Sequence, residues 1–500
     1  MKKILKIIRN YIGKNLLNLL IKLKRFDAFP SFVKLFPKSK YKAIQSLMHR
    51  GYLDLAYKIA KDHTPKEHEE LLVQRVLSMY DVKENGFQTP LLQNSTISGI
   101  KPLFVVHNSL PYEHAGYAIR THTIVKYLYK QGMNVDVVTR AGYPWDLIKH
   151  RDKPYKETDI IDGIVYKRLK DTNKTFKKGS DSNYISVYAQ ALVDEIVKNN
   201  YTLLHASSNY LNALAAIKAA SKTNIPVIYE MRGLWYITRT TLDSKFKTSG
   251  MYEYEHQMEL AAVKGANKVV VISQALKKLL KEWKIPQEKI TVIPNAVDIE
   301  IFQPLPKDVE LLNRYNLKDK FVIGFIGSLT GYEGLKELVL SVESLVKDGL
   351  KDIVLMIVGE GREKKNLESL VKSKNIIFTG RVPFEEVSKY YSIFDICPFP
   401  RNDYEVCRYV PPLKPLEAMA MQKAVIVSDV APLLEMVEVN KTALVCKADS
   451  VDSLKEKILE LYKDRQKVID LGKNARTWVK INRNWYNIAK KYKELYEFLD

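Results

Sequence analysis

The chain is poor in cysteine. Its 500 residues include only Cys397, Cys407 and Cys446, an odd number without CxxC or Cys/His ligand spacing. This pattern excludes a disulfide scaffold and gives no support for a structural zinc site. We expect three small, inert thiols and a reducing compartment.

Long uninterrupted hydrophobic runs are absent as well. Charges break every apolar window well before the roughly 20 residues that a membrane-spanning helix needs. The N-terminus does not resemble a signal peptide, because Lys14, Lys22 and Lys24 interrupt its apolar region and no small-residue cleavage site follows. With 46% hydrophobic and 27% charged residues, we expect a folded cytoplasmic protein, and its length predicts two or three domains.

Acidic residues are nearly missing from the first fifty positions. Thirteen Lys and Arg stand there against the single acid Asp27, and they supply more than half of the formal net charge of +22. The apolar residues of the same stretch recur at helical spacing: Ile4, Leu5, Ile7, Ile8, Ile12, Leu16, Leu19, Leu20 and Leu23. This predicts a basic amphipathic helix on the anionic inner face of the cytoplasmic membrane.

Two alternatives compete with membrane contact. The basic helix could instead dock on the protein's own core. Nucleic-acid binding is disfavoured, because the charge concentrates at the N-terminus and no nucleic-acid-binding module is recognisable.

The hydrophobic pattern changes along the chain. Helical periodicity covers residues 41–84, and a turn-rich stretch, 85–99, follows. Short β-branched runs then alternate with helices, which indicates buried parallel sheets built from βαβ units. The expected strands are 103–106, 135–139, 202–205, 227–229, 268–272 and 290–293, then 321–326, 353–358, 376–378, 393–396, 424–427 and 442–445.

We therefore expect an α/β protein with two Rossmann-like, doubly wound domains. The predicted spans are a helical extension over 1–98, one domain over 99–300, a second over 301–480, and a C-terminal helix over 481–500 that packs back on the first domain.

Glycine marks several strand-to-helix junctions, where doubly wound sheets bind ligands. Gly116 precedes a helix that opens with Arg120, a place where backbone N–H groups and a cation could meet a phosphate. Gly327 lies in GFIGSLTGYEGL, residues 324–335. That segment is neither a GxGxxG fingerprint nor a Walker A loop, which disfavours hydride transfer and P-loop ATP hydrolysis.

The segment 411–420, PPLKPLEAMA, is the most informative junction. Lys414 adds a positive charge at a proline-marked helix start, and Glu417 can accept two hydrogen bonds from a vicinal diol such as ribose. These features suit a nucleotide diphosphate. The alternative is a structural helix start with a surface glutamate.

Four spans closely resemble the signatures of glycosyltransferase family 4, in matching order: 292–298 (VIPNAVD) with Phe302, 358–361 (VGEG), 378–383 (FTGRVP) and 415–420 (PLEAMA). Further matches, 107–120, 138–144, 205–209 and 229–235, resemble a branch that builds bacterial surface polysaccharides, such as capsule or lipopolysaccharide.

The resemblance implies a GT-B, retaining, metal-independent hexosyltransferase that uses a nucleotide-diphosphate sugar and needs no cofactor. No Asp-x-Asp metal motif is apparent. The second domain would hold the donor and the first the glycan or lipid-linked acceptor. The implied donor residues are Gly116, Gly327, Ser328, Arg381, Val382, Arg408, Lys414, Pro415, Leu416 and Glu417, and the candidate catalytic residues are Arg120, His205 and Arg232.

The chain departs from the family pattern at four positions. Ser328 and Glu333 replace the usual Arg and Lys, Tyr409 replaces an acid, and Arg232 replaces a His. Stabilising the leaving diphosphate would then require other cations, for which Arg120, Arg232, Arg408 and Lys414 are candidates.

Each of these assignments has an alternative. Arg232 could be a structural residue paired with Glu230, and His205 a satisfied histidine at a strand end. At the level of function, the alternative to sugar transfer is a catalytically silent nucleotide-sugar-binding or scaffold subunit of a polysaccharide assembly complex.

Overall fold

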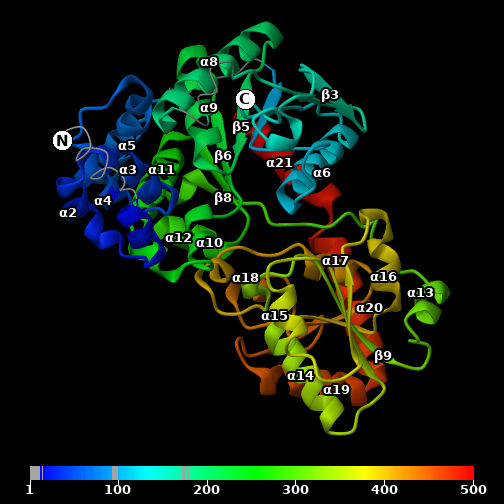
Figure 1. Ribbon diagram of the computed structural model, residues 1–500. Helices are drawn as coiled ribbons and strands as arrows, with labels where there is room; N and C mark the ends of the chain where they lie inside the picture. Colours follow the sequence, from blue (N-terminus) through cyan, green and yellow to red (C-terminus); the bar gives the residue numbers. More distant parts are fainter. Residues whose placement is uncertain (1–11, 14, 93–98, 172–175, 177–178, 500) are drawn as a thin grey trace. The chain divides into compact units, whose positions relative to one another are not determined.

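The computed structural model describes residues 12–13, 15–92, 99–171, 176 and 179–499 (Figure 1). Contacts divide the chain into two compact units. The first comprises residues 1–119, 134–269 and 499–500, and the second comprises 120–133 and 270–498. The apolar positions predicted at residues 4–8 lie outside the described residues.

The N-terminal extension is helical, as predicted, and belongs to the first unit. After a helical stretch over residues 15–22, it contains α2 (Phe29–Leu35), α3 (Lys40–His49), α4 (Leu53–Ala60) and α5 (Glu67–Asn85). Helices α4 and α5 pack against α11 (Gly250–Gly265) (Figure 1). Asp54 accepts a hydrogen bond from the Gly250 N–H at 2.9 Å, which satisfies an open donor at the start of α11.

The first sheet has the strand order β3-β4-β2-β1-β5-β6-β7-β8. Its strands are β1 (Pro102–Val106), β2 (Asp136–Thr139), β3 (Thr158–Ile161), β4 (Ile164–Lys167), β5 (Leu203–Ser207), β6 (Val227–Met231), β7 (Lys268–Val271) and β8 (Ile290–Val292). Strand β1 pairs in parallel with β2 and β5, whereas β3 is antiparallel to β4. The β3–β4 hairpin was not predicted, because β3 lies at the sheet edge and is half exposed.

Helices cover the first sheet. Helix α9 (Tyr210–Thr223) contacts β1, β5 and β6, and α8 (Asp181–Asn199) and α11 pack on α9. The first unit also contains α10 (Trp235–Thr240), and the second unit contains most of α6 (Gly116–Lys130) and α12 (Gln274–Glu282).

The second sheet is wholly parallel, in the order β11-β10-β9-β12-β13-β14. Its strands are β9 (Phe321–Ile326), β10 (Ile353–Val358), β11 (Ile376–Gly380), β12 (Ile396–Phe399), β13 (Ala424–Ser428) and β14 (Ala443–Cys446). The order runs outward from β9 to β11 and then reverses to β12, so the sheet is doubly wound with its switch point between β9 and β12.

One predicted strand is misplaced. Residues 393–396 were expected to be extended, but Ile393 ends helix α16 (Val387–Ile393) and β12 begins only at Ile396. Ile393 is buried as the last residue of that helix, and Phe394 packs over Gly324 of β9, so both apolar residues belong to the core without being part of the strand.

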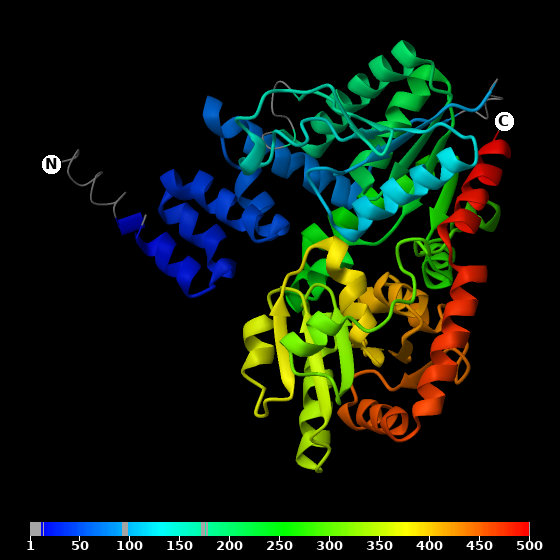
Figure 2. The same ribbon diagram turned by 90° about the vertical axis from the view of Figure 1, so that its right-hand side faces the viewer.

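The helices of the second unit pack in pairs. Helix α14 (Leu335–Lys347) lies against α19 (Val451–Lys463), and α17 (Lys414–Ala420) lies against α20 (Arg465–Asn482). Shorter helices are α13 (Val309–Arg314), α15 (Lys364–Glu368) and α18 (Ala431–Leu434). The chain then continues through α20 into α21 (Trp485–Glu497), drawn at its red end (Figure 2).

Glu259 is a buried carboxyl in the core of the first unit, 1% exposed on α11. Burial raises its pKa to about 8, although the Tyr229 hydroxyl that donates to it at 2.7 Å lowers the pKa. A raised pKa means that the folded state prefers the protonated acid. The resulting stabilisation is complete below the unfolded pKa of about 4.5 and is lost as the pH rises through 8.

We therefore expect Glu259→Gln to melt at a higher temperature than the wild type at pH 9, and its melting temperature to fall less between pH 5 and pH 9. Differential scanning fluorimetry measures both quantities. Glu253→Gln, at an exposed position of the same helix, is the matched control and should behave as wild type. Parallel pH profiles for wild type and Glu259→Gln would contradict the expectation.

Candidate functional site

The switch point of the second sheet brings glycine-rich backbone and a lysine together. Gly327 follows β9 with φ +152°, and a Cβ there would lie 2.1 Å from Cε of Lys414. A Cβ on Gly359, which follows β10, would lie 1.9 Å from the Gly327 carbonyl oxygen. The Lys414 stem therefore crosses a surface formed by bare backbone, at the sheet edge where ligands of this fold class bind.

Lys414 belongs to a three-membered ion cluster. Its Nζ lies 2.8 Å from Oε1 of Glu333, and the same oxygen lies 3.2 Å from a guanidinium nitrogen of Arg401. Burial by itself would raise the pKa of Glu333, but the two cations hold it at about 2. Glu333 is therefore a carboxylate at neutral pH, and the cluster carries one net positive charge.

Glu417 lies one turn after Lys414 on α17 and is half-buried. Its Oε2 accepts a hydrogen bond from the Tyr391 hydroxyl at 3.2 Å. Burial raises the pKa of Glu417, while Tyr391 and Lys414 lower it. A partly desolvated carboxylate with remaining acceptor capacity is suited to a pair of hydroxyl donors.

Three of the other predicted donor residues follow strands of the same sheet. Ser328 is exposed beside Gly327, and Arg381 and Val382 follow β11 at exposed and half-buried positions. Pro415 and Leu416 are buried in α17. Arg408 is paired with Asp403 through bonds of 2.7 and 2.8 Å, so it is engaged elsewhere.

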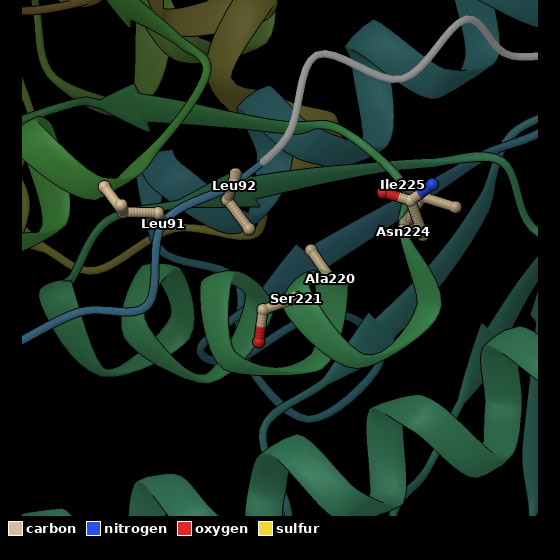
Figure 3. Close-up of a pocket in the computed structure, with 6 residues that line it drawn as sticks. All are labelled: Leu91, Leu92, Ala220, Ser221, Asn224 and Ile225. Atoms are coloured by element: carbon tan, nitrogen blue, oxygen red, sulfur yellow. The ribbon is translucent and has the colours of Figure 1, made fainter.

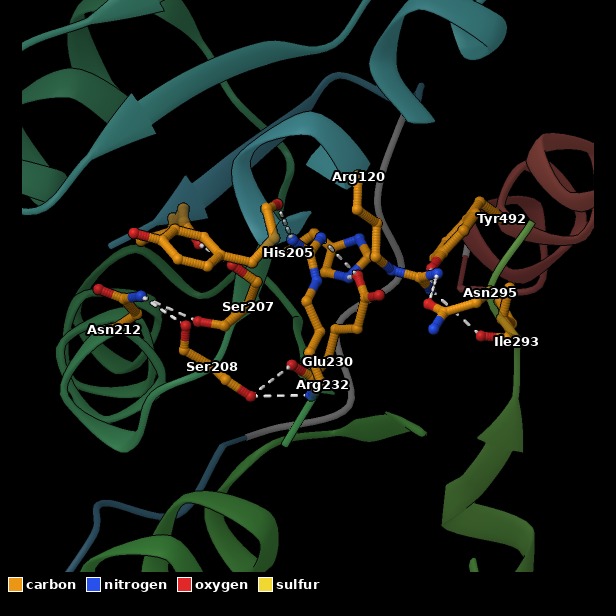
Figure 4. A network of polar contacts seen from close by, with 12 residues as sticks. Arg120, His205, Ser207, Ser208, Asn212, Glu230, Arg232, Ile293, Asn295 and Tyr492 are labelled. Carbon is orange, nitrogen blue, oxygen red and sulfur yellow. Dashed lines mark hydrogen bonds and ion pairs between the residues drawn. The ribbon is translucent and has the colours of Figure 1, made fainter. Parts of the chain in front are cut away.

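A second polar network occupies the carboxyl ends of β5 and β6 in the first unit (Figure 4). His205 is fully buried, stacked on Phe104, with Nε2 3.1 Å from Glu230. Arg232 also lies 3.1 Å from Glu230 and donates to the Tyr117 carbonyl at 3.0 Å. The structure thus contains the Arg232–Glu230 pair that the sequence offered as the alternative to a catalytic role.

Arg120 lies one turn after Gly116, the exposed first residue of α6, and its side chain is surrounded by protein groups of the second unit (Figure 4). It donates to Oδ1 of Asn295 at 2.7 Å, to the Ile293 carbonyl at 3.2 Å and to the Tyr492 hydroxyl at 2.8 Å. The residue is 3% exposed. These bonds tie α6 to the segment after β8 and to α21.

Comparison with known proteins agrees with this architecture. A model described as Glycosyltransferase Family 4 matches residues 115–301, and one described as Glycosyl transferases group 1 matches residues 310–478. The chain belongs to glycosyltransferase family 4. Its two parallel-sheet domains constitute the GT-B fold.

The individual relatives of this glycosyltransferase share only a modest fraction of its sequence. An uncharacterised glycosyltransferase of Methanocaldococcus jannaschii is 28% identical over 52% of the chain, and the match spans 65% of that relative's length. The capsular polysaccharide biosynthesis glycosyltransferase CapM of Staphylococcus aureus is 25% identical over 52% of the chain and 67% of its own length. The crystal structure of Anabaena HepE in complex with UDP has a TM-score of 0.60 at 16% identity, covering 80% of this chain and all of HepE.

An open pocket of this glycosyltransferase lies in the first unit. Leu91, Leu92, Ala220, Ser221, Asn224 and Ile225 line a hollow of about 250 Å³ at the end of α9 (Figure 3). None of the six side chains that line this pocket is an acid, a base or a thiol. Among the residues described, no helix is long and apolar enough to cross a membrane, and no three His, Cys, Asp or Glu gather as metal ligands.

The sequence did not predict the side chains that contact Lys414 and Glu417. Glu333 was noted only as a departure from the family, and Arg401 and Tyr391 were not considered. For Glu333, the sequence contains a local signal that could have placed it at the site, because it lies in the glycine-rich segment 324–335. Arg401 approaches Glu333 only because β12 lies beside β9, and nothing in the linear sequence shows this adjacency.

Arg120 provides a test that separates architecture from catalysis. Replacing it by Leu leaves Asn295, Ile293 and Tyr492 without their donor, which should cost on the order of 2–4 kcal/mol of stability. We expect Arg120→Leu to melt well below the wild type, with nucleotide affinity of the folded protein retained. Lys278→Leu, at an exposed cation of α12, is the control. An unchanged melting temperature with turnover abolished would support the catalytic role predicted from sequence.

Proposed function

We propose that this glycosyltransferase transfers a hexosyl unit from a nucleotide-diphosphate sugar to a polysaccharide or lipid-linked acceptor, with retention of anomeric configuration and without a metal ion. The observation that carries the proposal is the placement of Lys414 over Gly327, one helical turn before the half-buried Glu417. A cation next to bare backbone suits a diphosphate, and a desolvated carboxylate suits the ribose diol. That HepE binds UDP supports a nucleotide donor.

The proposed mechanism relies on positioning and electrostatics. Lys414 would stabilise the charge that develops on the departing diphosphate, and Glu417 would fix the nucleoside. Retention would follow if the donor phosphate itself accepts the proton of the incoming acceptor hydroxyl. The name of CapM supports a surface polysaccharide as the acceptor class.

Glu417 gives the direct test of the donor site. Thermal shift with a panel of UDP-, GDP- and ADP-sugars should identify the nucleotide, since a ligand that binds only the native state raises apparent stability. Loss of charge-assisted hydrogen bonds worth roughly 1.5–3 kcal/mol should weaken donor binding of Glu417→Ala about 10- to 100-fold. Glu438→Ala, at a surface carboxylate paired with Lys441, is the control.

Turnover then distinguishes an enzyme from a scaffold. With lipid-linked acceptors, nucleotide release that is insensitive to EDTA and a product of retained anomeric configuration by NMR are expected. Donor binding without any release would favour the silent scaffold subunit, and no binding of any nucleotide sugar would refute the donor site.

We further propose that the N-terminal extension holds the enzyme on the inner face of the cytoplasmic membrane. In the described part of its first helix, Leu17 is buried, whereas Ile12, Leu16, Leu19 and Leu23 are each 37–60% exposed and recur at spacings of four and three. They therefore share one helix face. Lys22, Lys24 and Arg25 are exposed nearby, and this combination of apolar and cationic groups complements anionic lipid.

We expect the double variant Leu16→Asp/Leu19→Asp to lose binding to vesicles that contain anionic phospholipid. Ser31→Asp/Gln45→Glu changes the net charge equally at exposed positions of α2 and α3, outside the first helix, so it should retain most of the binding. Vesicle co-sedimentation measures both variants. An equal loss of vesicle binding in the two variants would mean that net charge alone determines binding. It would contradict insertion of the leucines into the membrane.

A further inference from the structure

Glu333 occupies an unexpected place for an acid. It is 3% exposed and follows Gly331 and Tyr332 in a short 3-10 turn after β9, next to the lysine that the proposed donor site requires to be cationic. A carboxylate here would be expected to repel a diphosphate. Two cations share its Oε1, however, and the net charge of the cluster is positive.

The cluster is held rigidly from behind. Arg401 donates to the Val410 carbonyl at 2.8 Å, its own carbonyl accepts from the Ser428 hydroxyl at 2.7 Å, and its guanidinium lies over the Tyr332 ring. On the other side of Glu333, Gly334 has φ +71°, and a Cβ there would lie 1.7 Å from the Pro400 carbonyl oxygen. The acid therefore has little freedom to move.

Lys414 is the outer member of the cluster, with a side chain that is 18% exposed compared with 4% for Glu333 and 7% for Arg401. Its ammonium lies 5.2 Å from the centre of the Phe325 ring, and its stem crosses Gly327. A free lysine loses rotamer entropy when it binds an anion, so holding its side chain in place beforehand should favour binding.

We propose that Glu333 is a positioning residue, which, backed by Arg401, fixes the Lys414 ammonium over Gly327 so that it meets the diphosphate of the donor. This inference rests on the proposed function and adds to it the group that prepares the site. For nucleotide affinity, it predicts a change opposite to the one that net charge alone would give. Removing the acid adds a positive charge to the site, yet nucleotide affinity should fall because Lys414 loses its fixed position.

The probe is the nucleoside diphosphate, UDP, GDP or ADP, that stabilises the wild-type protein most, titrated by calorimetry. We expect Glu333→Gln to bind it about tenfold more weakly, which corresponds to 1.4 kcal/mol. With the matching sugar donor, KM should rise. Glu363→Gln is the charge-matched control, because its carboxylate, at the start of α15 after β10, lies near Gly331 and bonds to Asn366, with no contact to Lys414. Its affinity should remain equal or increase slightly.

A double-mutant cycle isolates the route of the effect. In a Lys414→Met background, Glu333→Gln should have no further effect on affinity. Unchanged or tighter binding by Glu333→Gln, or the same tenfold loss without Lys414, would overturn the positioning role. If Glu333→Gln does not fold, Glu333→Asp retains the charge, displaces the carboxylate by one methylene, and should show the same loss of affinity.

Failure of the two proposals can be told apart. If none of the three nucleotides binds the wild type, the donor site itself is refuted. If one binds the wild type and the cycle shows no coupling between Glu333 and Lys414, only the positioning role is lost.

Discussion

The candidate site depends on close approach of main chain to main chain at the carboxyl edge of the second sheet. A Cβ on Gly359 would lie 1.9 Å from the Gly327 carbonyl oxygen, and one on Gly361 would lie 2.1 Å from that of Leu329. A Cβ on Gly334 would lie 1.7 Å from the Pro400 carbonyl oxygen. The loops after β9, β10 and β12 can therefore converge only because these positions have no side chain. Lys414 lies over the surface that this convergence creates.

Charge at the site is determined by pairing and not by composition. The chain carries a formal net charge of +22, yet Arg408 is paired with Asp403 and Lys414 with Glu333. At the switch point a single net positive charge remains on the Glu333–Arg401–Lys414 cluster. Such a site would act through fixed position in a partly desolvated environment more than through accumulated charge.

The extension illustrates how one segment combines two roles. Its helices α4 and α5 pack on α11, and Asp54 is inserted against Gly250 at the start of that helix. Its first described helix buries Leu17 and leaves an apolar face in contact with solvent. The segment therefore docks on the protein, as one of the two alternatives from the sequence has it, and its contact with a membrane stays a prediction.

The linear sequence determined the features that depend on local patterns. Apolar runs bounded by turns placed most strands of both sheets, since burial on both faces leaves a continuous hydrophobic signal. Lys414 and Glu417 could be chosen because they are three residues apart on one short helix. The β3–β4 hairpin escaped because a half-exposed edge strand has no such signal.

Only the tertiary structure decided what the charged residues do. Arg120 was a candidate for a phosphate contact; in the structure it bonds to Asn295 and Tyr492, which are 175 and 372 positions away in the chain, and its catalytic role stays a prediction. His205 had two interpretations, a satisfied histidine at a strand end or an acceptor contact, and it lies inside the sheet against Glu230. A buried charge must find a partner wherever the fold supplies one, and for Arg120, His205 and Glu333 that partner is brought close by helix packing or strand order that the linear sequence does not encode.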